Sequence, residues 1–200
     1  VVNLMVVNND LPVKSVQELI SYAKKNPGKV VFGSDGNGTT SHLGMEYFRT
    51  LTGIDLLHVP YKSAPAMLTD LMGGSVQVAL SNTPVSGPHV QAGRMRAIGI
   101  TDDKRSPTFP HIPTVAEQGV TGYEVVAWGG LIGPANMPPD IVKRLNAEVL
   151  KALQNPEVIE KFKTFGAETS PSTPEEFLAL SKRETAKWAE VIKRSGAKVD

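Results

Sequence analysis

The first hundred residues alternate between short apolar runs and longer segments with helical periodicity. The first run covers Val1 to Val7, and from Val16 to Ala23 apolar residues recur at the i, i+3, i+4, i+7 spacing of an amphipathic helix. The alternation repeats and reaches a fifth apolar run at Met95 to Ile100. Strands that alternate with helices favour an α/β fold with a doubly wound sheet. In such sheets ligands bind beyond the carboxyl ends of the strands.

A stretch rich in glycine and hydroxyl groups follows the second predicted strand. Between Val30 and His42 a β-branched run gives way to three glycines within six residues and then to Thr and Ser side chains. Glycines expose their N–H groups, and the first N–H groups of the following helix lack partners, so this loop can hold a small anion. An ordinary strand-to-helix turn is the alternative, although it needs only one glycine and one cap. Gly38 is not followed by Lys, and the glycine spacing does not match the dinucleotide fingerprint.

Composition excludes several classes of function. The 200 residues include 21 basic and 20 acidic residues mixed along the chain, so we expect no nucleic-acid partner. There are no cysteines, and the four histidines lack metal-ligand spacing, so we expect no metal and no cofactor. No apolar run approaches the ~20 residues of a membrane span. Because the chain begins inside a strand-like run, we expect the natural protein to extend upstream.

The second half of the chain is organised differently. Thr101 to Gly122 is rich in proline and predicts an irregular surface segment with a brief helix at Thr114 to Gln118. Tyr123 to Ile132 has strand character and is a candidate crossing between lobes. Three helices are predicted after it, at about Pro139 to Gln154, Pro156 to Phe165 and Pro174 to Ser195. The last of them has an apolar side that needs a larger surface to pack against.

Short motifs with a fixed order are spread over the whole chain. They are Asn26-Pro27-Gly28-Lys29, Gly36-Asn37-Gly38-Thr39, His58-Val59-Pro60-Tyr61-Lys62, Leu68-Thr69-Asp70-Leu71-Met72-Gly73-Gly74, Lys104-Arg105-Ser106-Pro107, Ile112-Pro113-Thr114-Val115-Ala116-Glu117 and Leu145-Asn146-Ala147-Glu148-Val149. In this order and spacing they resemble the Bug (TctC) family of extracytoplasmic solute receptors, the binding components of tripartite tricarboxylate transporters.

The resemblance implies a type II periplasmic-binding-protein fold, with a doubly wound sheet in each of two lobes. Residues 7–124 then form one complete lobe, and residues 1–6 and 125–200 form the C-terminal part of the other lobe with the crossing strands. The lobes close on a small organic acid, a carboxylate or an amino acid, and deliver it to membrane transporter subunits. The resemblance also implies a periplasmic, exported protein whose signal peptide precedes this chain. The missing N-terminal segment, or another chain, is expected to cover the C-terminal helices.

The resemblance places ligand binding in the loop after the second strand and in the polar loop after the fourth. The predicted ligand-binding residues are Ser34, Asn37, Gly38, Thr39, Thr40, Ser41, Tyr61 and Asn82. A ligand carboxylate is expected to accept hydrogen bonds from the loop N–H groups and hydroxyls, with Asn82 adding an amide donor. An Asx turn before Pro84 is the alternative role for Asn82. The family commonly has a glycine after the Tyr-Lys pair, whereas the segment Tyr61-Lys62-Ser63-Ala64-Pro65 is one residue shorter, which weakens the case for direct contact from Tyr61 or Lys62.

Two other functions stay open at this point. Asp35, Ser41 and His42 include the residue types of a catalytic triad, but neighbouring helical residues point to different faces, and no Gly-x-Ser-x-Gly elbow is present. A serine hydrolase is therefore disfavoured, and we expect no catalytic residues. Asp35 beside an anion site is expected to face solvent or cap a turn. The stronger alternative to transport is a solute-sensing or regulatory module built on the same fold.

Overall fold

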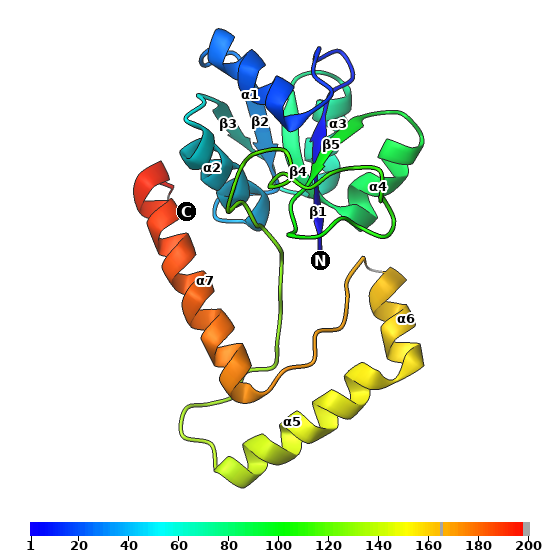
Figure 1. Ribbon diagram of the computed structural model, residues 1–200, viewed down its shortest axis with the longest axis vertical. Coiled ribbons are helices and arrows are strands. Elements are labelled where there is room, and N and C mark those ends of the chain that lie inside the picture. The colour runs from blue at the N-terminus through cyan, green and yellow to red at the C-terminus, as the bar shows by residue number, and fades with distance from the viewer. Residues whose placement is uncertain (165, 198–200) are drawn as a thin grey trace. The chain divides into compact units, whose positions relative to one another are not determined.

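The structure is a computed structural model that describes residues 1–164 and 166–197 (Figure 1). Its contacts divide the chain into two compact units, each of which is described by itself. The larger unit comprises Val2–Ala127 and the described residues from Glu190 onward, and the smaller unit comprises Val1 and Trp128–Ala189. Among the described residues, no helix combines the length and apolarity needed to cross a bilayer.

The larger unit is built on a five-stranded mixed sheet. Its strands are β1 (Asn3–Val7), β2 (Val31–Ser34), β3 (Leu57–Pro60), β4 (Val78–Asn82) and β5 (Arg96–Ile100). Their order is β3-β2-β4-β1-β5, with β2 parallel to β3 and β4, and β1 antiparallel to β4 and β5. The predicted α/β class is confirmed. Residues 3–6, which the resemblance assigns to the other lobe, pair with β4 and β5 inside this sheet.

Four helices join these strands and pack on both faces of the sheet (Figure 1). They are α1 (Val16–Lys25), α2 (Thr40–Thr52), α3 (Ala64–Met72) and α4 (Thr83–Gln91). On one face, α2 approaches β4 so closely that a Cβ atom on Gly44 would lie 2.6 Å from Leu80 Cδ1. On the other face, Met67 and Leu71 of α3 pack with Leu4 of β1 in one buried cluster. Both faces of the sheet are therefore covered, as the continuous apolar run of β1 predicts.

The chain between β5 and the smaller unit is irregular. The brief helix expected at Thr114 to Gln118 is replaced by a turn, in which the Glu117 carboxylate accepts from Thr114 N at 2.7 Å. The strand expected over Tyr123 to Ile132 is reduced to an isolated bridge between Val126 and Val2. One reason is that Val125 N donates to the carbonyl of Thr101 at 2.8 Å instead of joining a continuous ladder.

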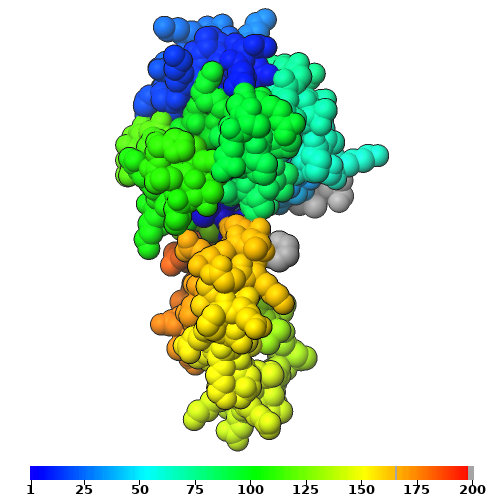
Figure 2. Space-filling view, turned by 90° about the vertical axis from the view of Figure 1, so that its right-hand side faces the viewer, coloured from blue at the N-terminus to red at the C-terminus, as the bar shows by residue number. Residues whose placement is uncertain are grey.

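The smaller unit contains α5 (Pro139–Gln154), α6 (Pro156–Thr164) and most of α7 (Pro174–Ser195). Phe165, the predicted end of the second of these helices, lies outside the described residues. The ring of Trp128 meets the ring of Phe177 edge-to-face with centroids 5.5 Å apart. Neither α5 nor α6 has a buried residue along its fully described length, and Figure 2 shows their surface in yellow. Large apolar side chains are exposed on these helices and elsewhere in the unit, namely Leu131, Ile132, Ile141, Leu145, Phe162 and Leu178.

Candidate ligand-binding site

Three strand ends meet at the edge of the sheet where the sequence predicts ligand binding. The carboxyl ends of β2 and β3 are joined because Tyr61 N donates to the carbonyl of Ser34 at 2.9 Å. β4 ends there at Asn82, which pairs in register with Asn3 of β1. Because β1 runs antiparallel, its amino end reaches this edge as well. The structure thus brings Ser34, Tyr61 and Asn82 to one edge and adds Asn3, which sequence reasoning missed.

The loop from Ser34 to Ser41 has the backbone conformation that its glycines permit. Gly36 has φ of 137° and Gly38 has φ of 75°, both in the region that side chains rarely adopt. Thr39 caps α2, since its Oγ1 accepts from His42 N at 3.4 Å. Ser34 is fully buried, whereas the stretch from 35 to 40, including Asn37, is half-exposed. The loop is therefore anchored by a buried residue at its start, and the rest of it is partly accessible to solvent.

The hydroxyl groups of this loop hold the loop itself. Thr39 Oγ1 donates to the carbonyl of Gly36 at 2.8 Å, and the Ser41 hydroxyl donates to the Asp35 carboxylate. Asp35 N in turn donates to Ser41 Oγ at 3.1 Å, so Asp35 closes a turn, one of the two roles expected for it. The backbone N–H groups of Thr40 and Ser41 have no partner among the described residues, nor has the Thr40 hydroxyl. These three donors are available to an anion at the start of α2.

Tyr61 and Asn82 differ in what they can offer a ligand. The Tyr61 hydroxyl donates to Asp70 Oδ2 at 2.7 Å, so it is already engaged with α3. Burial, helped by the hydrogen bond and charge of Asp70, raises the pKa of Tyr61 to about 12. Asn82 precedes α4 without a capping hydrogen bond from its side chain. The Asx turn weighed as its alternative role is therefore not formed at the α4 cap, and its amide stays available.

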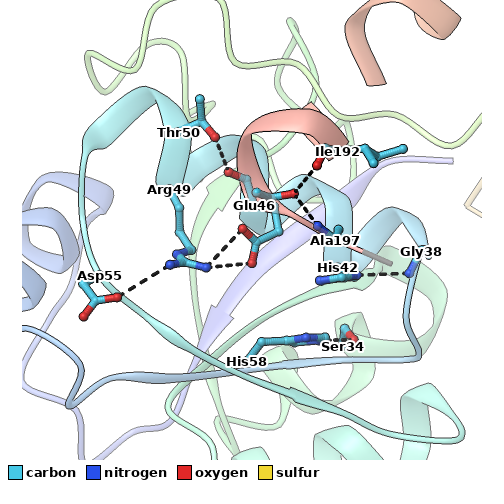
Figure 3. A network of polar contacts seen from close by, with 11 residues as sticks. Ser34, Gly38, His42, Glu46, Arg49, Thr50, Asp55, His58, Ile192 and Ala197 are labelled. Carbon is cyan, nitrogen blue, oxygen red and sulfur yellow. Dashed lines mark hydrogen bonds and ion pairs between the residues drawn. The ribbon is translucent and has the colours of Figure 1, made fainter. Parts of the chain in front are cut away.

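Two histidines that are distant in sequence lie together beneath this loop. The imidazoles of His42 on α2 and His58 on β3 stack with centroids 4.0 Å apart and 6° between planes. The Phe32 ring stacks with His58 as well, with centroids 4.6 Å apart. His42 Nδ1 accepts from Gly38 N at 3.0 Å, and His58 Nε2 lies 2.7 Å from Ser34 Oγ (Figure 3). The pair is thus bonded to both ends of the glycine-rich turn.

The environment of this pair favours uncharged imidazoles. Burial lowers the pKa of His42, against a smaller upward effect of Glu46. Burial also lowers the pKa of His58 to about 4, with His42 and Arg49 adding to the effect. The parallel register of β2 with β3 places Phe32 opposite His58. The sequence alone does not reveal the stack, because His42 and His58 lie 16 positions apart and only the register brings them together.

The comparison with known families decides what kind of protein carries this site. The tripartite tricarboxylate transporter family receptor pattern, TctC, matches residues 2–197. The chain belongs to this receptor family. Its members are solute-binding receptors and not enzymes. Protein BugT of Bordetella pertussis is 33% identical to this receptor chain over 98% of its length, which is 60% of BugT. The chain spans less than two thirds of the length of the curated relatives it first matches.

Solved structures of relatives have the same fold. Rpa4515 of R. palustris, solved with adipate, is 38% identical and superposes with a TM-score of 0.85 over 100% of this chain and 67% of its own. The periplasmic binding protein BugD is 31% identical with a TM-score of 0.80, covering 100% and 67%. MatC of Rhodopseudomonas palustris, with bound malate, is 27% identical with a TM-score of 0.78, covering 96% and 66%. The relatives thus include periplasmic proteins and dicarboxylate binders.

Proposed function

We propose that this protein is a periplasmic receptor that captures a small dicarboxylate at the loop 34–41 and delivers it to the membrane subunits of a tripartite tricarboxylate-type transporter. The observation that carries the proposal is the set of open donors at the start of α2, the N–H groups of Thr40 and Ser41 and the Thr40 hydroxyl. Structural relatives that hold adipate and malate support the ligand class.

Neutral donors suffice for a carboxylate at this position. The first N–H groups of a helix point outward and carry the positive end of its dipole, so they hold an anion without a buried cation. The Asn82 amide, from the neighbouring strand end, adds a fourth donor. Hydrogen bonds to a charged acceptor contribute more than neutral ones, roughly 1.5–3 kcal/mol each.

The architecture behind the proposal is a pair of lobes. We propose that residues 7–124, which lie within the larger unit, form the complete lobe, and that the smaller unit belongs to the C-terminal part of the other. Ile132 is 83% exposed and Leu131 67% exposed, although such side chains normally pack against further chain. We assign their cover to an N-terminal segment of the full-length protein, since the relatives are longer than this chain. That segment then supplies the opposite wall of the ligand cleft.

The test is calorimetry on the full-length protein with adipate and malate. Thr40→Val removes one open hydroxyl, and we expect it to weaken binding about tenfold, the equivalent of ~1.4 kcal/mol. Thr39→Ala combined with Ser41→Ala is expected to weaken binding further, because it releases the loop. Ser15→Ala is the matched control, since Ser15 caps α1 at the opposite edge of the sheet and should leave affinity unchanged. Unchanged affinity in the loop variants would contradict the site.

A second measurement separates transport from sensing. Uptake of the bound solute by cells is expected to require both this protein and its membrane subunits. If uptake is unaffected by deletion of the receptor while tight binding persists, sensing is the better assignment.

A further inference from the structure

We propose that His42 and His58 are positioning residues that keep the ligand loop in its binding form only while both imidazoles are uncharged, so that acid weakens ligand binding. The effect on ligand binding rests on the proposed function, whereas the coupling between the charge of His42 and the conformation of the loop does not. Neither histidine is among the predicted ligand residues, and both lie under the loop rather than on it.

The hydrogen bond from Gly38 N to His42 Nδ1 fixes the state of the ring. At 3.0 Å the amide proton needs the lone pair of Nδ1, so a neutral His42 carries its proton on Nε2. If His42 Nδ1 were protonated, its N–H would face the Gly38 N–H at this distance, and the two donors would repel each other. The Gly38 amide then has to turn away, and the residues that follow it, Thr40 and Ser41, carry the donors offered to the ligand.

The second ring strengthens this dependence on charge. The ring centroid of His58 lies 4.0 Å from that of His42, and His58 Nε2 is hydrogen-bonded to Ser34 Oγ at the other end of the turn. A charge on one imidazole opposes a charge on its stacked neighbour. His42 is itself only 5% exposed, so water offers little compensation. The stacked pair therefore behaves as one unit that supports both ends of the loop when uncharged.

Charged groups around the pair act in both directions on His42 and only against protonation of His58. Glu46, one turn after His42, favours its charged form, but Arg49 binds Glu46 at 2.8 and 3.1 Å and opposes protonation of both rings. An oxygen of the Asp55 carboxylate lies 3.6 Å from a guanidinium nitrogen of Arg49 (Figure 3). The Asp35 carboxylate is bonded to the Ser41 hydroxyl. On the last turns of α7, the exposed Glu190 and Arg194 pair with each other at 2.6 Å. Burial thus remains the main influence on the pair.

A nuclear magnetic resonance titration of the ligand-free full-length protein tests the structural part. We expect the Gly38 amide resonance to shift with the same midpoint as the His42 ring, below pH 6.5. In His42→Asn, whose side-chain oxygen takes the place of Nδ1 but cannot titrate in this range, the Gly38 resonance is expected to stay constant. A Gly38 amide that does not respond while His42 titrates would overturn the proposal.

Calorimetry with adipate tests the effect on binding. The ratio of the wild-type dissociation constant to that of His42→Asn, measured at each pH from 8 to 4.5, cancels the ionisation of adipate itself. We expect this ratio to rise several-fold from its value at pH 8 as the pH falls and His42 gains its proton. His42→Leu is expected to bind weakly at every pH. A flat ratio, or tighter wild-type binding in acid, would refute the positioning role; absent binding with intact Gly38 coupling would instead refute the proposed function.

Discussion

Replacement of Thr101 by Val tests how much the Thr101 hydroxyl stabilises the contact between β1 and the end of β5. The Thr101 side chain is fully buried, and its Oγ1 lies 2.6 Å from the carbonyl of Val125 and 3.3 Å from Asn3 N. Val has nearly the same shape but no hydroxyl. The change removes a hydrogen bond worth ~1 kcal/mol and leaves the buried Asn3 N–H without a partner, at a further ~1–3 kcal/mol. We therefore expect Thr101→Val to lower the free energy of unfolding by about 2–4 kcal/mol.

Urea denaturation followed by circular dichroism measures this loss as a shift in midpoint at constant slope. Thr101→Ser is the matched control, because it keeps the hydroxyl and loses only a buried methyl group, at ~1 kcal/mol. If Thr101→Val proves as stable as Thr101→Ser, the Thr101 hydroxyl does not stabilise the contact between β1 and the end of β5.

Two further predictions follow from ionisable groups at the same edge of the sheet. The pKa of Tyr61 should be about 12, above the usual 10, in an ultraviolet absorbance titration compared with Tyr61→Phe, because the hydroxyl is desolvated and bonded to Asp70. A component at pH 10 that Tyr61→Phe removes would contradict this environment. The pKa of His58 is depressed from 6.5 to about 4, so the folded state binds fewer protons than the unfolded state. The contribution of neutral His58 to the free energy of unfolding should be fully present above pH 6.5 and should fall by up to ~3 kcal/mol as the pH approaches 4. The free energy of unfolding of His58→Gln should decrease less over the same pH range.

The alternation of elements could be predicted from the sequence, but the direction of β1 could not. Apolar periodicity and capping residues such as Ser15 and Thr39 locate the helices because these signals are local. A continuous apolar run reads the same in a strand that runs up or down the sheet. The antiparallel direction of β1 is decided by its pairing with β4 and β5. This direction places Asn3 at the candidate site, and no sequence motif predicts that position.

The sequence predicts the conformation of the loop at the candidate site but not the contacts that its side chains make. Glycines and hydroxyls identified the loop, but which proton each hydroxyl donates depends on the folded backbone. The sequence predicts Thr39 and Ser41 as ligand donors, whereas in the structure both hydroxyls donate to groups of the loop itself. The stack of His42 on His58 likewise requires the register of β2 with β3, which no spacing within the sequence encodes.

The internal use of these hydroxyls bears on how the proposed receptor could discriminate among solutes. The side chains of Thr39 and Ser41 bond within the loop, so the loop offers a solute mainly backbone N–H groups. These groups recognise a carboxylate but not the rest of the solute. Both adipate and malate offer such a group, so the contact at Thr40 and Ser41 should contribute equally to the binding of either acid. Thr40→Val is then expected to weaken both by the same factor. Selectivity between them has to arise where the rest of the solute lies, away from the start of α2.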